Sequence, residues 1–262
     1  MVVSKKRKGI IPNETKWPPS RKAREVFDGK EYSMRPSANL STLSSGFRRP
    51  SQDVIEEFES LIPNLNNFDS SKYMRSVKAQ FEFDGSVAVS ALKNPRKLKY
   101  ERKKIAKEVP GGFRRSFDGS AAEVGDIVDG AFKHAFTTSS SMTNAQRISK
   151  FHPLFQLEVV GCCDGMYEDR PIEVKSVSSL SSMNVTNTLA RNWFQLAAYN
   201  WLYGRSPIIA IVSRETLEIE VVEVEQDMVE TAMKNWYDWE SSSDRQVSPA
   251  KVPIRSDTVL VK

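Results

Sequence analysis

Two β-rich segments joined by a polar turn, residues 155–163 and 172–177, constrain the fold of this 262-residue chain most strongly. Apolar residues alternate with other residues over much of both segments, which is typical of strands that bury one face. Apolar residues at helical spacing and further strand-like runs surround them. We expect helices at 121–136, 189–203 and 226–240, and strands at 208–213 and 217–224. This order predicts an α/β fold.

The two segments bring three ionic residues close together in the sequence. Asp164 closes the first segment, and Glu173 and Lys175 lie two positions apart in the second. Because side chains alternate along a strand, Glu173 and Lys175 should share a face while Val174 points into the core. If the segments pair as a hairpin, both carboxylates and the Val174 carbonyl form an oxygen pocket suited to Mg²⁺ or Mn²⁺. Lys175 could then orient an attacking water or neutralise phosphate charge.

A non-catalytic interpretation explains the same residues one by one. Asp164 with Gly165 is a common turn pair, and Glu173 with Lys175 can form an ordinary charge pair on an exposed strand. Val174, however, together with Ile172, indicates a strand in the centre of a sheet, where ionic groups on the other face would be costly. The functional interpretation is therefore favoured.

At these residues the chain resembles the PD-(D/E)XK nuclease superfamily, especially its RecB-like and lambda-exonuclease-like (YqaJ-type) branches. The family signature, an Asp followed by (Asp/Glu)-x-Lys on the next strand, is matched by Asp164, Glu173 and Lys175. These branches also carry Gln-x-x-x-Tyr on the following helix, matched by Gln195 and Tyr199, which their spacing places on one helix face. The resemblance implies that the first three residues are catalytic and that Gln195 and Tyr199 hold the substrate strand.

The resemblance extends over residues 121–224 and implies a restriction-endonuclease-like αβββαβ core, in which helices flank a mixed central sheet. In the family an upstream helix carries Gly-x-x-x-His, the His being a metal ligand, whereas this chain has Gly125 followed by Asp129 in that frame. The implied metal ligands are an acidic residue of this helix together with the two strand carboxylates and one carbonyl: Asp129, Asp164, Glu173 and Val174. Asp126 or Glu123 could replace Asp129, which could instead form an ion pair with Lys133.

Positive charge is concentrated upstream of this region. Residues 1–50 hold twelve Lys and Arg against four Asp and Glu, and residues 93–115 hold ten against two, so each stretch carries +8 in a chain of net charge +5. Such segregation favours a polyanionic partner, which in combination with the resemblance is DNA, single- or double-stranded.

We expect four parts along the chain. They are a basic, mostly disordered arm at 1–50, a basic helical extension at 51–118, the nuclease core at 119–240 and a tail at 241–262. Within the extension, helices are expected at 52–62, ending at Pro63, and at 94–108.

The sequence also bears on location. We find no run approaching the roughly 18 apolar residues of a membrane-spanning helix, and no secretory signal. The adjacent Cys162 and Cys163 favour a reducing, intracellular setting. The basic cluster at 5–8 could be a nuclear-import signal, a phosphate-contacting patch or a solvated tail. We therefore expect a cytoplasmic or nuclear protein, and the oligomeric state stays open.

The resemblance thus leads us to expect an Mg²⁺- or Mn²⁺-dependent deoxyribonuclease, with exonuclease action in DNA processing, recombination or degradation. One alternative is an RNA-cutting endonuclease of the same fold that uses His134 as a metal ligand; Gln195 and Tyr199 argue against it. The other is a non-catalytic nucleic-acid-binding protein on a nuclease fold. Asp129 in the place of His favours that alternative, and the intact Asp, Glu and Lys argue against it.

Overall fold

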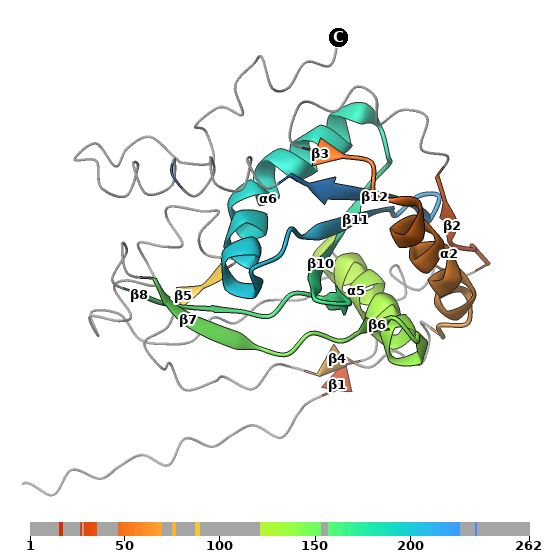
Figure 1. Ribbon diagram of the computed structural model, residues 1–262. Coiled ribbons are helices and arrows are strands. Elements are labelled where there is room, and N and C mark those ends of the chain that lie inside the picture. Colours follow the sequence, from red (N-terminus) through yellow and green to blue (C-terminus); the bar gives the residue numbers. More distant parts are fainter. Residues whose placement is uncertain are drawn as a thin grey trace, which may run out of the picture.

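A mixed seven-stranded sheet forms the centre of the molecule (Figure 1). The computed structural model describes residues 16–17, 27, 29–35, 47–69, 75–76, 87–89, 121–152, 157–225 and 234. The sheet contains β2 (Ser33–Met34), β3 (Phe47–Arg48), β6 (Met142–Thr143), β9 (Gly165–Tyr167), β10 (Arg170–Val177), β11 (Ile208–Ser213) and β12 (Glu218–Val224). The strand order is β2-β12-β11-β10-β9-β6, and β3 also pairs with β12. The chain is therefore an α/β protein with a mixed sheet, as the sequence predicted.

Strand β10 is the central element because it pairs with a neighbour of each kind. It runs parallel to β11 and antiparallel to β9, with Glu173 opposite Ile209 and Ile172 opposite Gly165. A parallel neighbour requires a crossover connection, which is supplied by α6 (Ser182–Tyr203). This helix begins at Ser182 rather than 189, because the Ser181 side chain accepts a hydrogen bond from the Asn184 N–H. It ends as expected at Gly204, whose φ of 72° suits glycine.

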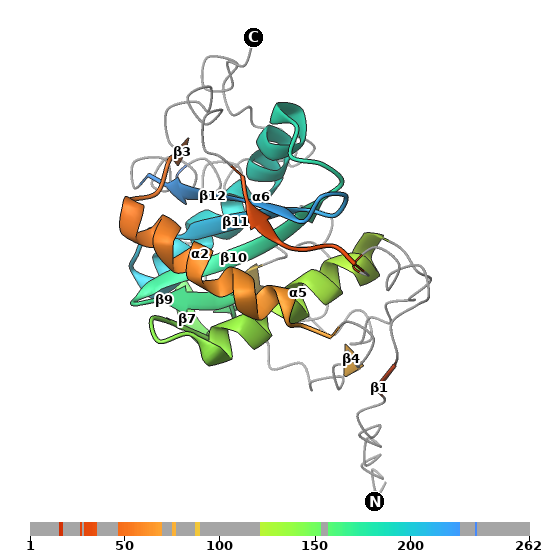
Figure 2. The ribbon, with the colours of Figure 1, turned by 90° about the vertical axis from the view of Figure 1, so that its right-hand side faces the viewer.

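Helices cover both faces of the sheet. Helix α6 lies on one face, and α5 (Ala121–Thr138) and α2 (Gln52–Asn66) lie on the other (Figures 1 and 2). Strand residues alternate between the two layers: Ile172 and Val174 belong to the same apolar cluster as Phe132 of α5. Ile209 and Ile211 of β11 belong to the cluster that contains α6. Glu173 and Lys175 alternate with Ile172 and Val174 along β10, so these two ionic side chains point toward the α6 layer.

A smaller sheet leads into the central one. It consists of β5 (Val87–Ala88), β8 (Leu157–Gly161) and β7 (Ile148–His152), with β8 in the middle. Residues 162–164 connect β8 to β9, so Asp164 lies where the chain passes from one sheet to the other. A separate pair joins β1 (Lys16–Trp17) to β4 (Arg75–Ser76). The sequence did not predict β7, because four of its five side chains are exposed or partly exposed and leave no alternating pattern.

The stretch expected to be a disordered arm contributes strands to the central sheet. β2 and β3 pair with β12, and Arg48 forms an ion pair with the buried Glu223. The expectation of a disordered arm is therefore wrong for these residues, because two-residue strands held by long-range ion pairs produce no local period. The expected helix at 94–108, the tail at 241–262 and nearly all of the helix at 226–240 lie outside the described residues.

Helix α2 does not end at Pro63 as predicted but continues to Asn66. Proline removes one backbone hydrogen bond of the helix. The contacts made by the next turn compensate for the stability lost with that bond. Leu65 in that turn is buried, and the Asn66 side chain accepts a hydrogen bond from the Tyr32 N–H. None of the helices in the described ranges is long and apolar enough to cross a membrane.

Replacing Gly165 by Ala should destabilise the fold. A Cβ at this position would overlap the buried ring of Phe136 on α5, with its Cδ2 atom at 2.7 Å. We expect a loss of about 1–3 kcal/mol in the free energy of unfolding, measured by denaturant titration. In a Phe136→Ala background, which removes the ring, the additional loss from Gly165→Ala should nearly disappear. An equal loss in both backgrounds would contradict this explanation.

Candidate functional site

Asp164 is held against β10 by two hydrogen bonds. Its backbone N–H donates to the Ile172 carbonyl at 2.9 Å, and its Oδ2 accepts from the Val174 N–H at 2.8 Å. The hairpin itself is formed by β9 and β10, so Asp164 precedes the short strand β9 instead of ending the preceding strand. This arrangement brings its carboxylate beside the middle of β10 and leaves the side chain 19% exposed.

Glu173 and Lys175 share one face of β10, and Val174 faces the opposite, apolar layer, as predicted. The Lys175 ammonium contacts Glu173 Oε1 and lies 2.9 Å from the Val174 carbonyl oxygen. Glu173 is only 3% exposed. A buried carboxylate needs such partners, because isolated charge in a protein interior is strongly unfavourable.

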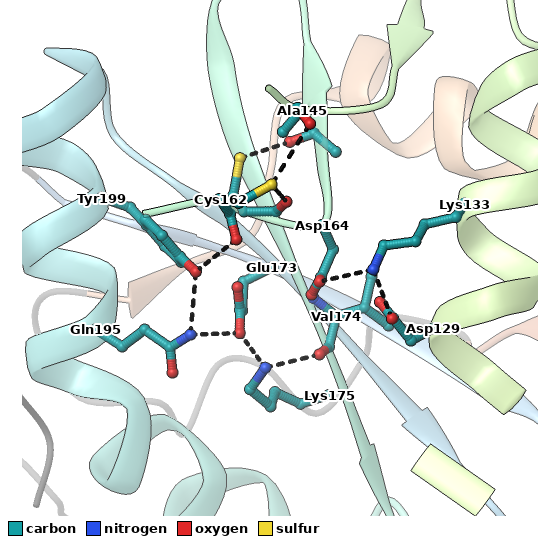
Figure 3. A network of polar contacts seen from close by, with 12 residues as sticks. Asp129, Lys133, Ala145, Cys162, Asp164, Glu173, Val174, Lys175, Gln195 and Tyr199 are labelled. Atoms are coloured by element: carbon teal, nitrogen blue, oxygen red, sulfur yellow. Dashed lines mark hydrogen bonds and ion pairs between the residues drawn. The ribbon is translucent and has the colours of Figure 1, made fainter. Parts of the chain in front are cut away.

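Helix α6 supplies the next two members of this network, which is drawn in Figure 3. Gln195 Nε2 donates to Glu173 Oε1 at 2.7 Å and lies 3.2 Å from the Tyr199 hydroxyl oxygen. The Tyr199 hydroxyl donates to the Cys162 carbonyl at 3.1 Å. Gln195 and Tyr199 are each 4% exposed. Their burial favours a role in orienting Glu173 and the 162–164 connection over the direct contact with substrate that the sequence suggested.

Helix α5 approaches from the other side of Asp164. Lys133 Nζ lies 2.7 Å from Asp129 Oδ2 and 4.0 Å from Asp164 Oδ1. The ion pair that the sequence offered as an alternative for Asp129 is therefore present. The other oxygen, Asp129 Oδ1, is buried without a hydrogen-bond partner in the described part of the chain. The helix comes this close because Gly125 faces β10, where a Cβ would lie 3.3 Å from the Ser176 hydroxyl oxygen.

Helix α5 also carries Lys133 and His134, which the sequence suggested as an ion-pair partner and as an alternative metal ligand. Lys133 belongs to the site although the sequence suggested it only as a surface ion-pair partner; its spacing of four from Asp129 was the available signal. The His134 ring lies 6.0 Å from the Phe68 ring, so it packs toward the end of α2. Glu123 and Asp126 lie earlier on the helix, and the ion pair with Asp164 comes from the turn that holds Asp129 and Lys133.

Burial and neighbouring charges change the pKa values of Asp164 and of the two lysines beside it. Burial, followed by the charges of Glu173 and Asp129, raises the pKa of Asp164 well above its ordinary value, against the opposing effect of Lys175. Burial alone would lower the pKa of Lys175, but Glu173 and Asp164 outweigh it and raise that pKa. Lys133 behaves in the same way beside Asp129. Both lysines are therefore ammonium ions at neutral pH, and they offset part of the negative charge.

The donor atoms of this site suit a hard divalent cation. Carboxylate oxygens of Asp164 and Glu173 and the Val174 carbonyl are of the kind that Mg²⁺ and Mn²⁺ prefer. The orphaned Asp129 Oδ1 would gain a partner if it also bound the ion. Within the described ranges, no three His, Cys, Asp or Glu side chains are already gathered into a metal-ion cluster. Instead, ammonium groups lie against the acidic oxygens, so a cation would compete with Lys175 for Glu173 and the Val174 carbonyl.

Neither a protein-family model nor a curated protein sequence matches this chain. Among solved structures, one described as the crystal structure of SSO0001 is similar with a TM-score of 0.42 and 17% sequence identity. The match covers 72% of this chain and 88% of the other. Similarity at this level is too weak to support an inference about fold or function.

The raised pKa of Asp164 predicts a pH-dependent effect of Asp164→Asn. A carboxyl whose pKa is higher in the folded than in the unfolded state favours folding below the unfolded pKa, near 3.9, and loses that contribution as pH rises through the folded pKa. Asn cannot ionise, so Asp164→Asn should gain stability relative to the unsubstituted protein as pH rises from 4 to 8. Unfolding free energies by denaturant titration would measure the difference.

Asp169→Asn is the matched control, because Asp169 is exposed and paired with Arg205 at the surface. Its difference from the unsubstituted protein should vary little with pH. A constant difference for Asp164→Asn across the same range would contradict the assigned electrostatics.

Proposed function

We propose that this chain is an Mg²⁺- or Mn²⁺-dependent nuclease that hydrolyses DNA phosphodiester bonds on a restriction-endonuclease-like core. The observation that carries the proposal is the meeting of Asp164, Glu173 and Lys175 beside the Val174 carbonyl. These groups are brought together by a short β-hairpin and by the alternation of side chains along β10. The resemblance to RecB-like and lambda-exonuclease-like nucleases supports exonuclease action.

In this proposal the residues divide the work by their chemistry. Asp164, Glu173, the Val174 carbonyl and Asp129 would hold the cation, which when bound supplies Lewis-acid stabilisation of the phosphate. Lys175 stays protonated at neutral pH because its pKa is raised, so it acts as a hydrogen-bond donor and positive charge and not as a base. Its ammonium can orient a water molecule for attack on phosphorus or stabilise charge that develops on the phosphate oxygens.

Gln195 and Tyr199 act on this chemistry through other residues. Gln195 holds one carboxylate oxygen of Glu173, and Tyr199 holds the Cys162 carbonyl two residues before Asp164. Partners of metal-binding carboxylates fix their orientation, and their loss typically lowers metal affinity or activity about 10–100-fold. We therefore assign both residues to positioning.

The two alternative functions receive less support from the site. An RNA-cutting endonuclease with His134 as a ligand requires an imidazole that here packs on Phe68. A non-catalytic binding protein would not need Glu173, 3% exposed, to be buried near two more carboxylates. The charge concentrated in residues 93–115, outside the described residues, supports a nucleic-acid partner, whose binding should weaken steeply with salt.

Asp164→Ala and Lys175→Ala should each abolish cleavage while leaving DNA binding nearly intact. We expect at least a 10²–10³-fold loss of rate, on the order of the loss when one electrostatic stabiliser is removed. Labelled single- and double-stranded DNA and RNA, incubated with Mg²⁺, Mn²⁺ or EDTA, measure cleavage, and fluorescence anisotropy in EDTA measures binding. Asp169→Ala is the surface control. Cleavage that survives both site substitutions, or that continues in EDTA, would refute the proposal.

Gln195→Leu should lower kcat about 10–100-fold with little change in KM, because Gln195 is buried against Glu173 and does not reach the substrate. Steady-state kinetics on labelled DNA separate the two constants. Gln146→Leu, which changes an exposed glutamine, should leave both unchanged. A higher KM with unchanged kcat would instead show that Gln195 binds the substrate strand directly.

A further inference from the structure

Two lysines contact the carboxylates of the site, one on each side of Asp164. Lys175 contacts Glu173 and the Val174 carbonyl on β10, whereas Lys133 from α5 lies against Asp129 Oδ2 and near Asp164 Oδ1. Figure 3 shows Lys133 and Asp129 on one side of Asp164, with Glu173 and Lys175 on the other. The two oxygens of Asp164 therefore face different partners: Oδ2 accepts the Val174 N–H, and Oδ1 lies toward Lys133.

We infer that Lys133 takes the place of a second divalent cation and restricts the site to one metal ion per chain. This inference rests on the proposed function. In two-metal sites the ions lie about 3.5–4 Å apart and are usually bridged by shared oxygen ligands. Asp164 is the carboxylate placed to bridge here. Asp129 Oδ1 is left to the first ion, so a second ion would need Asp164 Oδ1 and Asp129 Oδ2. Those are the oxygens that the Lys133 ammonium approaches.

The balance of charge supports a single ion. Three carboxylates, Asp129, Asp164 and Glu173, face two ammonium groups, which leaves a formal charge of −1 when all are ionised. One divalent cation changes this to +1, which matches the single negative charge of a phosphodiester. A second cation would raise it to +3 beside two fixed ammonium groups, and the repulsion would be strong in a partly desolvated site.

The role of Lys133 can be tested by substitution because Lys133 is not a core residue. Its side chain is 45% exposed, and its contacts in the network are ionic. The positive charge can therefore be removed without opening a cavity, and Lys133→Gln should fold normally. Lys133→Arg retains the charge and serves as the conservative variant.

Counting bound Mn²⁺ by electron paramagnetic resonance on the full chain tests the inference without relying on activity. Counts are taken above the background of Asp164→Asn, which weakens the shared carboxylate. We expect one Mn²⁺ for the unsubstituted protein, two for Lys133→Gln, and one again for Lys133→Arg. Lys150→Gln is the matched control, because Lys150 lies over the Trp201 ring, and it should bind one.

The outcomes separate this inference from the proposed function. Two ions in the unsubstituted protein with Mg²⁺-dependent cleavage would overturn the role of Lys133 and leave the nuclease assignment in place. One ion in Lys133→Gln would also overturn it. If Lys133→Gln fails to fold, Lys133→Met takes its place: two ions support the inference and one ion rejects it. No bound Mn²⁺ together with no cleavage would refute the proposed function itself.

Discussion

Mutual repulsion among three carboxylates, the buried Glu173 and the partly exposed Asp164 and Asp129, is the constraint on which this structure depends. Glu173 and Asp164 approach each other on the sheet, and Asp129 adds a third negative charge from α5. Three carboxylates this close together are stable only if positive charges and hydrogen-bond donors surround them. The fold supplies them from three elements: Lys175 from β10, Lys133 from α5 and Gln195 from α6. The packing of both helices against β10 is therefore as important to the site as the acidic residues themselves.

The parts of the site that follow a local period could be predicted from the sequence. Alternation along a strand placed Glu173 and Lys175 on one face, and a spacing of four placed Gln195 and Tyr199 together on α6. Helix α5 and the end of α6 at Gly204 were also predicted, because apolar spacing and a terminal glycine are local signals.

The features that were missed depend on contacts distant in sequence. β2 and β3 consist of two residues each and exist because β12 offers an edge, and α2 continues past Pro63 because Leu65 and Asn66 find partners. The burial of Gln195 and Tyr199 could not be predicted from the motif either. Their spacing shows that they share a helix face, but it does not show which other residues pack over that face. The same is true of Lys133, whose approach to Asp164 depends on the path of the 162–164 connection.

The pairing of the early strands with β12 has a practical consequence for anyone who shortens this protein. A truncation at residue 50, chosen to remove a basic stretch, would leave backbone groups of β12 unpaired along an open border of the sheet. Glu223 would also lose the guanidinium of Arg48 and keep that of Arg170. Uncovered strand borders act as templates for strands from other molecules, so the shortened protein would tend to aggregate.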